Sequence, residues 1–267
     1  MKTTILAAVA AATATATAGL DVSGYGSFDV SSAYVLYGAK INKDPSDWTY
    51  GELNATAEGW GGPGASLWQN SDMTCRRKGS MRRMNEWDWA AYYRNKFNFS
   101  NGCSIVCEAG HIWYKYHGLK NTAKSSYKTM MEAYGRLEFQ NPYLTPHVFA
   151  AYDWQVTDGT FATLGVKRDI ALPFGLTFTP DLTVGGGDVR YLECLYPPWG
   201  EENINSGLSY VQISGKLSYW FNNRFGIHSQ VACATIANDR IRSGIDADGS
   251  DYRKQFVWGM IGVDMAF

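Results

Sequence analysis

The sequence predicts an all-β fold, a closed antiparallel transmembrane β-barrel of about twelve strands. Three observations predict it. Apolar and polar residues alternate along segments of about 10 to 15 residues from Gly24 to the C-terminus, without helical periodicity. Short turns and longer loops alternate between these segments, as expected for short periplasmic turns and longer extracellular loops. The mean hydropathy of −0.26 excludes a bundle of transmembrane helices but fits strands with one polar face.

Composition narrows the classes of function. The chain has 267 residues, of which 18% are charged and 15% aromatic, and its formal net charge is −1. That length fits one large all-β domain or two small ones. A nearly neutral chain carries no global basic field, so we expect no nucleic-acid partner.

The first 18 residues are predicted to be a cleaved secretory signal peptide. Lys2 is followed by an apolar, small-residue stretch from Ile5 to Ala18, and Ala16-Thr17-Ala18 provides a cleavage site. An N-terminal helix of the folded domain is the alternative, but the stretch is too rich in Ala and Thr to pack well. The predicted domains are the signal peptide, 1–18, and the barrel, 19–267.

The last segment shows the alternation most clearly. Val257, Ile261, Val263 and Met265 share one face, and Asp264 lies on the other. The predicted strands lie near 25–38, 48–58, 64–72, 86–98, 103–117, 127–140, 145–156, 160–171, 175–186, 206–220, 224–236 and 254–267. An even number places both termini at the same rim. Ten strands remain an alternative if two segments are misassigned.

Two segments fit the pattern poorly. Glu108 in 103–117 and Arg168 in 160–171 fall on faces that are otherwise apolar. A charge facing lipid at the midplane costs roughly 2–4 kcal/mol, so a bulge or a shifted register is expected at these strands.

The five cysteines give no metal or cofactor motif. Cys103 and Cys107 lie on one predicted strand, too far apart to pair with each other. Cys75 and Cys194 lie in predicted loops, where a disulfide between them is one possibility and two free thiols the other. No C-x-x-C with partner ligands occurs, so we expect neither metal nor cofactor.

The ends of the barrel segment resemble known proteins. The run from Phe256 to Phe267 resembles the C-terminal pattern of bacterial outer-membrane proteins, in which a terminal Phe follows alternating apolar positions. This resemblance implies an outer-membrane location and recognition of Phe267 by the barrel-assembly machinery. The run from Phe28 to Gly38 is similar to the opening strand of the TorF-type porin family, with Ala33 and Tyr37 departing from the family's Asp and Arg. Segments 65–72 and 108–114 resemble the same family more weakly, and the resemblance implies a porin.

Charged side chains are expected on the inward face of this barrel. They are Asp29, Glu52, Glu58, Glu86, Asp88, Arg94, Lys96, Glu132, Arg136, Glu138, Asp153, Lys167, Asp181, Lys216, His228 and Asp264. A narrow channel lined by these groups would pass small hydrophilic solutes or ions, with a mild preference for cations because acids outnumber bases. The alternative is a salt-bridge network that fills the lumen.

A basic cluster lies in the predicted outer loop 73–85. It consists of Arg76, Arg77, Lys78, Arg82 and Arg83. The cluster could bind lipopolysaccharide phosphates or attract anions, or be a solvated loop without a ligand. A second loop segment, Asp246–Asp251, resembles part of a calcium loop but lacks the acid at its twelfth position, which favours an ordinary acidic turn.

Three classes of function remain open. The first is a porin-like channel in contact with outer-membrane lipids and lipopolysaccharide. The second is a closed barrel that acts as a structural or adhesive surface protein through loops 73–85, 187–205 and 237–253. The third is a secreted β-sandwich that binds carbohydrate through its aromatics. An enzyme is not expected, because His228 and Ser229 fall on opposite faces of a strand and no hydrolase motif occurs. The oligomeric state is left open.

Overall fold

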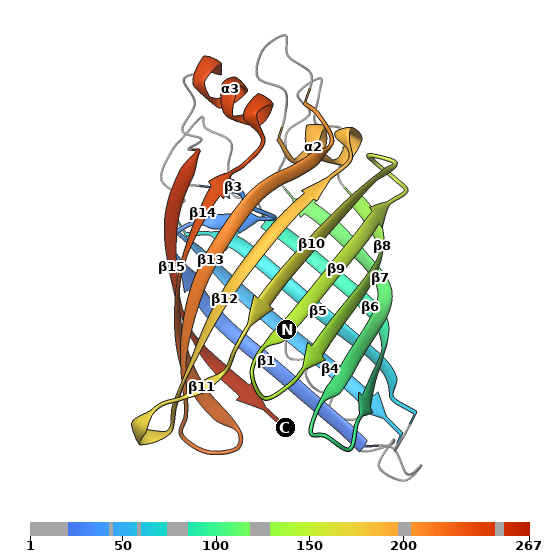
Figure 1. Cartoon of the computed structure of the whole chain (residues 1–267), viewed down its shortest axis with the longest axis vertical. Helices are drawn as coiled ribbons and strands as arrows, with labels where there is room; N and C mark the ends of the chain where they lie inside the picture. The colour runs from blue at the N-terminus through green and yellow to red at the C-terminus, as the bar shows by residue number, and fades with distance from the viewer. Residues whose placement is uncertain are drawn as a thin grey trace.

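The computed structural model describes residues 21–42, 45–57, 60–73, 85–117, 129–196, 204–248 and 254–267. Within these ranges twelve long antiparallel strands form a single ring (Figure 1). The long strands are β1 (Asp21–Ser31), β4 (Ser46–Thr56), β5 (Gly62–Asp72), β6 (Asn85–Asn98), β7 (Ser104–His117), β8 (Thr129–Gln140), β9 (Thr145–Asp153), β10 (Gly159–Lys167), β12 (Leu176–Gly187), β13 (Gly207–Trp220), β14 (Phe225–Ile236) and β15 (Gln255–Ala266). All twelve predicted segments overlap these strands, so the prediction of twelve rather than ten is confirmed.

Six shorter elements interrupt the connections. They are β2 (Tyr34–Leu36), β3 (Ala39–Asn42), β11 (Ile170–Ala171), the 3₁₀ helix η2 (Pro173–Gly175), α2 (Val189–Leu195) and α3 (Asp239–Asp248). None of the described helices is long and apolar enough to cross a membrane.

The ring closes where the first strand pairs with the last, and the short β11 does not interrupt it. β1 pairs with β15, with Asp29 opposite Gly262, and β10 pairs with β12, with Lys167 opposite Asp181. Because every long strand then has a neighbour on both sides, the sheet has no open edge. This closure allows an antiparallel sheet to span the hydrocarbon core of a membrane.

The two ends of the barrel differ. One end, the turn rim, carries the turns β4–β5, β6–β7, β8–β9, β10–β12 and β13–β14, and the other, the loop rim, carries α2 and α3 (Figure 1). Both ends of the ring lie at the turn rim, where Gly24 and Phe267 exchange backbone hydrogen bonds of 2.9 and 3.0 Å.

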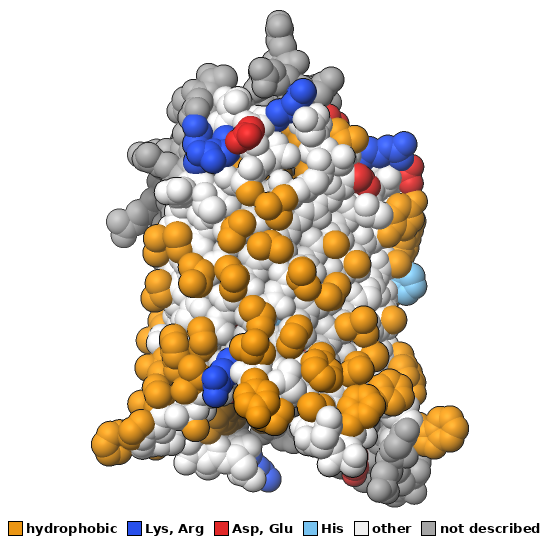
Figure 2. All heavy atoms as spheres, in the orientation of Figure 1, with side chains coloured by type: hydrophobic (Ala, Val, Ile, Leu, Met, Phe, Trp, Pro, Cys, Tyr) orange, Lys and Arg blue, Asp and Glu red, His pale blue; other side chains and the backbone are white. Residues whose placement is uncertain are grey.

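The outer face is apolar. Val257, Ile261, Val231 and Ile213 are each exposed by 60% or more of their surface. In Figure 2, apolar side chains cover the wall of the barrel, and most charged side chains in view gather toward its two ends. This is the reverse of a water-soluble β-sandwich, which buries its apolar face and exposes the polar one.

The structure corrects three local predictions. The first strand ends at Ser31 and not near residue 38, because the chain turns away from the wall and forms the two-stranded sheet β2–β3. The segment 160–171 is not one strand: β10 ends at Lys167, and β11 follows after Arg168 as part of a turn. The loops at 187–205 and 237–253 contain the helices α2 and α3, whose short length hid them from a search for helical periodicity.

Candidate functional site: the barrel lumen

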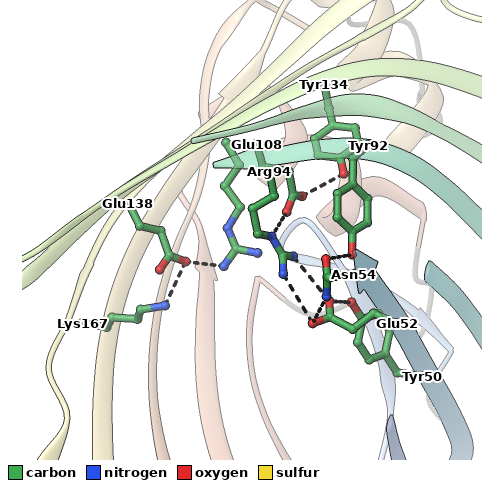
Figure 3. A network of polar contacts seen from close by, with 10 residues as sticks. Tyr50, Glu52, Asn54, Tyr92, Arg94, Glu108, Tyr134, Glu138 and Lys167 are labelled. Atoms are coloured by element: carbon green, nitrogen blue, oxygen red, sulfur yellow. Dashed lines mark hydrogen bonds and ion pairs between the residues drawn. The ribbon is translucent and has the colours of Figure 1, made fainter. Parts of the chain in front are cut away.

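The contacts between strands show which face points inward. Arg94 on β6 reaches Glu52 on β4 across β5, and beside it Tyr92 meets Asn54 over Gly64, which has no side chain to block them. Such a contact between strands that are not neighbours is possible only on the concave side of the sheet. Figure 3 shows these side chains meeting inside the barrel.

The Arg94 network is the first of two charged networks toward the turn rim. Arg94 Nε donates to Glu108 Oε2 at 2.6 Å, and its terminal nitrogens lie 3.4 Å from the Glu52 carboxylate. Two phenols complete the network: that of Tyr134 donates to Glu108 at 2.8 Å, and that of Tyr50 to Glu52 at 2.6 Å. One guanidinium thus serves two carboxylates, which leaves the network net negative.

Tyr92 and Asn54 extend this network along the wall. The Tyr92 phenol donates to Asn54 Oδ1 at 3.0 Å, and Asn54 Nδ2 donates to Glu52 at 3.3 Å. The Arg94 guanidinium also lies 4.9 Å from the centre of the Tyr92 ring, a cation–π contact.

The Glu138 network is the second, one strand further round the barrel. Lys167 on β10 donates to Glu138 on β8 at 3.0 Å, and Arg136 pairs with the same carboxylate (Figure 3). Beside it, His147 on β9 lies 3.1 Å from Asp181 on β12. These contacts link β8, β9, β10 and β12 through charged side chains on the inward face.

A third group, the seam cluster, joins the strands at which the ring closes. His228 on β14 lies between Asp29 on β1 and Asp264 on β15, at 2.8 and 2.9 Å from its two ring nitrogens. The phenol of Tyr25 donates to Asp264, and Ser27 Oγ donates to Asp29 at 2.7 Å. With both imidazole nitrogens engaged by carboxylates and Ser229 on the opposite face, His228 is not set up to activate a serine.

The loop-rim half of the lumen carries acids on one wall. This acidic layer consists of Glu86 and Asp88 on β6, Glu132 on β8 and Asp153 on β9. Glu86, Glu132 and Asp153 are fully buried. The phenol of Tyr114 donates to Glu132 at 2.7 Å, and the backbone N–H of Thr157 donates to Asp153 at 2.7 Å. Among the described contacts, Glu132 and Asp153 accept from phenols and backbone N–H groups, whereas the networks nearer the turn rim pair carboxylates with arginine and lysine.

The inward hairpin, residues 32–42 including β2 and β3, crosses the lumen above the acidic layer. At its base the Tyr34 phenol donates to Glu86 at 2.7 Å, and the Tyr34 ring lies 5.5 Å from that of Trp68. At its tip the Tyr37 ring lies 4.4 Å from Phe161 on β10 and 6.0 Å from Phe149 on β9. The hairpin leaves the wall beside β15 and reaches the opposite side of the ring.

Helix α2 covers the same region from the loop rim. Asp188 caps it by accepting from Tyr191 N at 3.0 Å, and the Tyr191 phenol reaches into the lumen and donates to Glu132 at 2.5 Å. An apolar cluster surrounds it. The cluster contains Phe161, Tyr191, Leu192, Tyr196, Ile204, Tyr210, Ile236 and Ile241, all buried. The described loop-rim half of the barrel is therefore packed like a protein core.

The structure brings most of the predicted inward residues into these groups. Arg94, Glu52, Arg136, Glu138 and Lys167 belong to the two networks, and Asp181 adjoins the second. Lys96 and Lys216 lie on the inward face by register, opposite Val106 and Gln230, and belong to neither network. Glu58, Cys75 and the basic loop residues Arg76, Arg77, Lys78, Arg82 and Arg83 lie outside the described residues. Cys194 carries no disulfide in the part of the chain that is described.

Sequence reasoning missed Glu108 and His147. Glu108 faces inward with Val106, Gly110, Ile112 and Tyr114, so its face is inward although most of its neighbours are apolar. The register would have found it, because Glu108 pairs directly with Arg94. There is no bulge here: the apolar neighbours belong to the inner wall and not to the lipid-facing one.

Solved structures resemble the whole barrel. A KdgM porin is 13% identical, with a TM-score of 0.50 over 92% of this chain and 99% of that chain. Outer membrane phospholipase A from Escherichia coli is 14% identical over 91% of this chain and 92% of that one, with a TM-score of 0.47. The β domain of the Bordetella autotransporter BrkA is 12% identical over 92% and 100%, with a TM-score of 0.48. No protein-family profile and no curated protein matches the sequence. The chain has the fold of an outer-membrane β-barrel.

Proposed function

We propose that the protein is a porin-like channel of the bacterial outer membrane that passes small hydrophilic solutes or ions. One observation carries this proposal: a closed ring with an apolar outer wall encloses an inward face lined with charged side chains, most of them carboxylates. A barrel that served only as a scaffold could fill its lumen with apolar side chains at lower cost, because burying ion pairs is expensive.

The charge balance favours cations. Carboxylates outnumber lysines and arginines on the inward face of the described strands. A pore lined with excess negative charge attracts cations and repels anions. The predicted inward residues would therefore set a weak cation selectivity.

The test is single-channel recording with refolded mature protein in a planar bilayer under a salt gradient. We expect discrete conductance steps and a reversal potential on the cation side. Folding is checked separately by the mobility shift on boiling in SDS that folded barrels show. Silence from protein that shows this shift would overturn the channel and favour the closed surface barrel. A reversal potential on the anion side would overturn the cation preference alone.

The proposed partners follow from a location in the outer membrane. Lipid surrounds the apolar wall, and lipopolysaccharide would contact the loop rim, where the basic cluster in loop 73–85 is the proposed phosphate-binding segment. Phe267 at the turn rim is the proposed recognition element for the barrel-assembly machinery. Replacement of the five basic residues by Gln should weaken binding to lipopolysaccharide micelles and leave the barrel folded.

A further inference from the structure

The inward hairpin is attached to the barrel by its base. Ser32 N donates to Gly259 O at 2.9 Å, and Gly259 N donates back to Ser32 Oγ at 3.0 Å. Ser31 Oγ adds a hydrogen bond of 2.7 Å to Ala33 O. These contacts fix residues 31–33 on β15 at the point where the chain leaves the wall.

Beyond this base the inward hairpin is not part of the barrel sheet. β2 and β3 pair only with each other and form a separate two-stranded sheet. A lone two-stranded hairpin is marginally stable in water, so the position of this one depends on its contacts with the wall, through Tyr34 next to the base and through the tip. The hairpin can therefore move without breaking any pairing of the ring.

The tip is held by a small set of non-covalent contacts. The Tyr37 ring packs on Phe161, its carbonyl oxygen accepts from Tyr196 OH at 3.2 Å, and its phenol lies 3.4 Å from that of Tyr114. Gly38 lies against the Tyr210 ring so closely that a Cβ would collide with it. The tip thus fits one pocket formed by β7, β10, β13 and α2.

The backbone of the tip is in an unfavourable conformation. Tyr37 has φ +47° and Gly38 has φ +76°, both in the left-handed region. Glycine adopts this region freely, whereas a residue with a side chain does so at a cost and needs its surroundings to hold it there. Tyr37 therefore combines a strained backbone with the ring that locks the hairpin in place.

We propose that the inward hairpin is a gate, hinged at residues 31–33 and latched by Tyr37, that closes the loop-rim half of the lumen. When the latch is released, the tip leaves Phe161 and Tyr210, and one of the two covers over the acidic layer is removed, α2 being the other. This inference rests on the proposed channel function and adds a device that controls it. A gated channel is mostly closed at rest and opens when the closed state loses its contacts.

The test compares open probability in single-channel recordings of four proteins. Tyr37→Ala removes the latch ring, and Gly38→Val prevents the tip from seating, because its φ and the Tyr210 ring both exclude a β-branched side chain. Tyr143→Ala is the matched control: the same change at an exposed turn-rim residue, 75% accessible. The wild-type protein is the reference, and all four must show the boiling-dependent mobility shift.

We expect rare openings of the wild type, an open probability raised about tenfold in Tyr37→Ala and Gly38→Val, and no change in Tyr143→Ala. The gate would be overturned by a wild type that is continuously open, or by latch variants that open no more often than the wild type. Either result would leave the proposed channel function unaffected. If none of the four folded proteins conducts, the channel itself is wrong and the gate falls with it.

Discussion

The phenol of Tyr34 donates a 2.7 Å hydrogen bond to the carboxylate of Glu86, and both residues lie almost wholly inside the barrel. Tyr34 is at the base of the inward hairpin and Glu86 on β6, so this bond ties the hairpin to the wall beneath it. A hydrogen bond to a buried carboxylate is worth more than one between neutral groups, because the charge has little water to solvate it.

Tyr34→Phe should therefore destabilise the barrel by about 2 kcal/mol. The ring and its packing on Trp68 remain, so the loss reports the hydroxyl alone. The measurement is the temperature at which the SDS-resistant form disappears, with Tyr143→Phe at the exposed turn as the control. Equal temperatures for Tyr34→Phe and the control would show that the bond contributes nothing to stability.

Arg94 is expected to govern both stability and selectivity. Arg94→Gln leaves Glu52 and Glu108 without their shared cation and should cost about 1–3 kcal/mol, less than for a fully buried pair because the arginine side chain is 29% exposed. It also removes a positive charge from the lumen, so the reversal potential should move further toward cations. Arg224→Gln, in a turn outside the lumen, is the control. A shift toward anions would contradict the placement of Arg94 on the conduction path.

The barrel could be predicted from the sequence because its signal is repeated. Every membrane-facing strand must alternate, so a mistake in one segment is corrected by the other eleven. The Glu108 strand shows the limit of that signal: its inner face is mostly apolar, and only the pairing with Arg94 shows which side is inward.

The inward hairpin could not be predicted for a different reason. The residues Tyr34-Val-Leu-Tyr-Gly38 follow the first strand closely and are mostly β-formers, so they are indistinguishable from a continued strand. What turns them into the lumen is a pocket made by Phe161, Tyr196 and Tyr210, which are far away in sequence. Helix α2 was not predicted because a helix of seven residues is too short to show a helical period in the sequence.

Asp188 should make the seating of α2 depend on pH. Its burial alone would raise the pKa of this carboxyl, but hydrogen bonds from the backbone N–H groups of Tyr191 and Thr160 outweigh it and lower the pKa below its usual value. A lowered folded-state pKa means that the stabilisation is complete above the unfolded value of about 3.9 and is lost as pH falls through the folded value.

Asp188→Ala therefore tests the pH dependence directly. At pH 6 the variant should be less stable than the wild type by about 1 kcal/mol, the usual value of a helix N-cap. The difference should shrink as the pH is lowered below about 4. Melting of the SDS-resistant form at each pH provides the measurement. A difference that stays constant down to pH 2.5 would show that the ionised cap is not its source.

The seam cluster should be essential for closing the ring. The side chain of His228 is 2% exposed, and those of the flanking Asp29 and Asp264 are 7% and 2% exposed. His228→Leu would leave two buried carboxylates without their shared partner, at a cost of about 3–5 kcal/mol. Adding Asp29→Asn should restore part of this loss, because contacting residues are not additive. His111→Leu, on the exposed outer face, is the control for the same change. If Asp29→Asn gives no recovery in a urea titration, the three residues do not act together.

We expect the Phe267 ring to keep its position only when residue 24 is a glycine. On the outer face of the seam the Phe267 ring lies directly over Gly24, in the space that a Cβ would fill, while the two residues exchange backbone hydrogen bonds. Gly24→Val should displace the ring and destabilise the closing pair by about 1–3 kcal/mol, the usual cost of overpacking. Gly51→Val on β4 is the matched control, because nothing lies within 4 Å of a Cβ at that position. The measurement is the fraction of protein that refolds into the SDS-resistant form. Equal yields for the two variants would show that the terminal ring does not need the glycine beneath it.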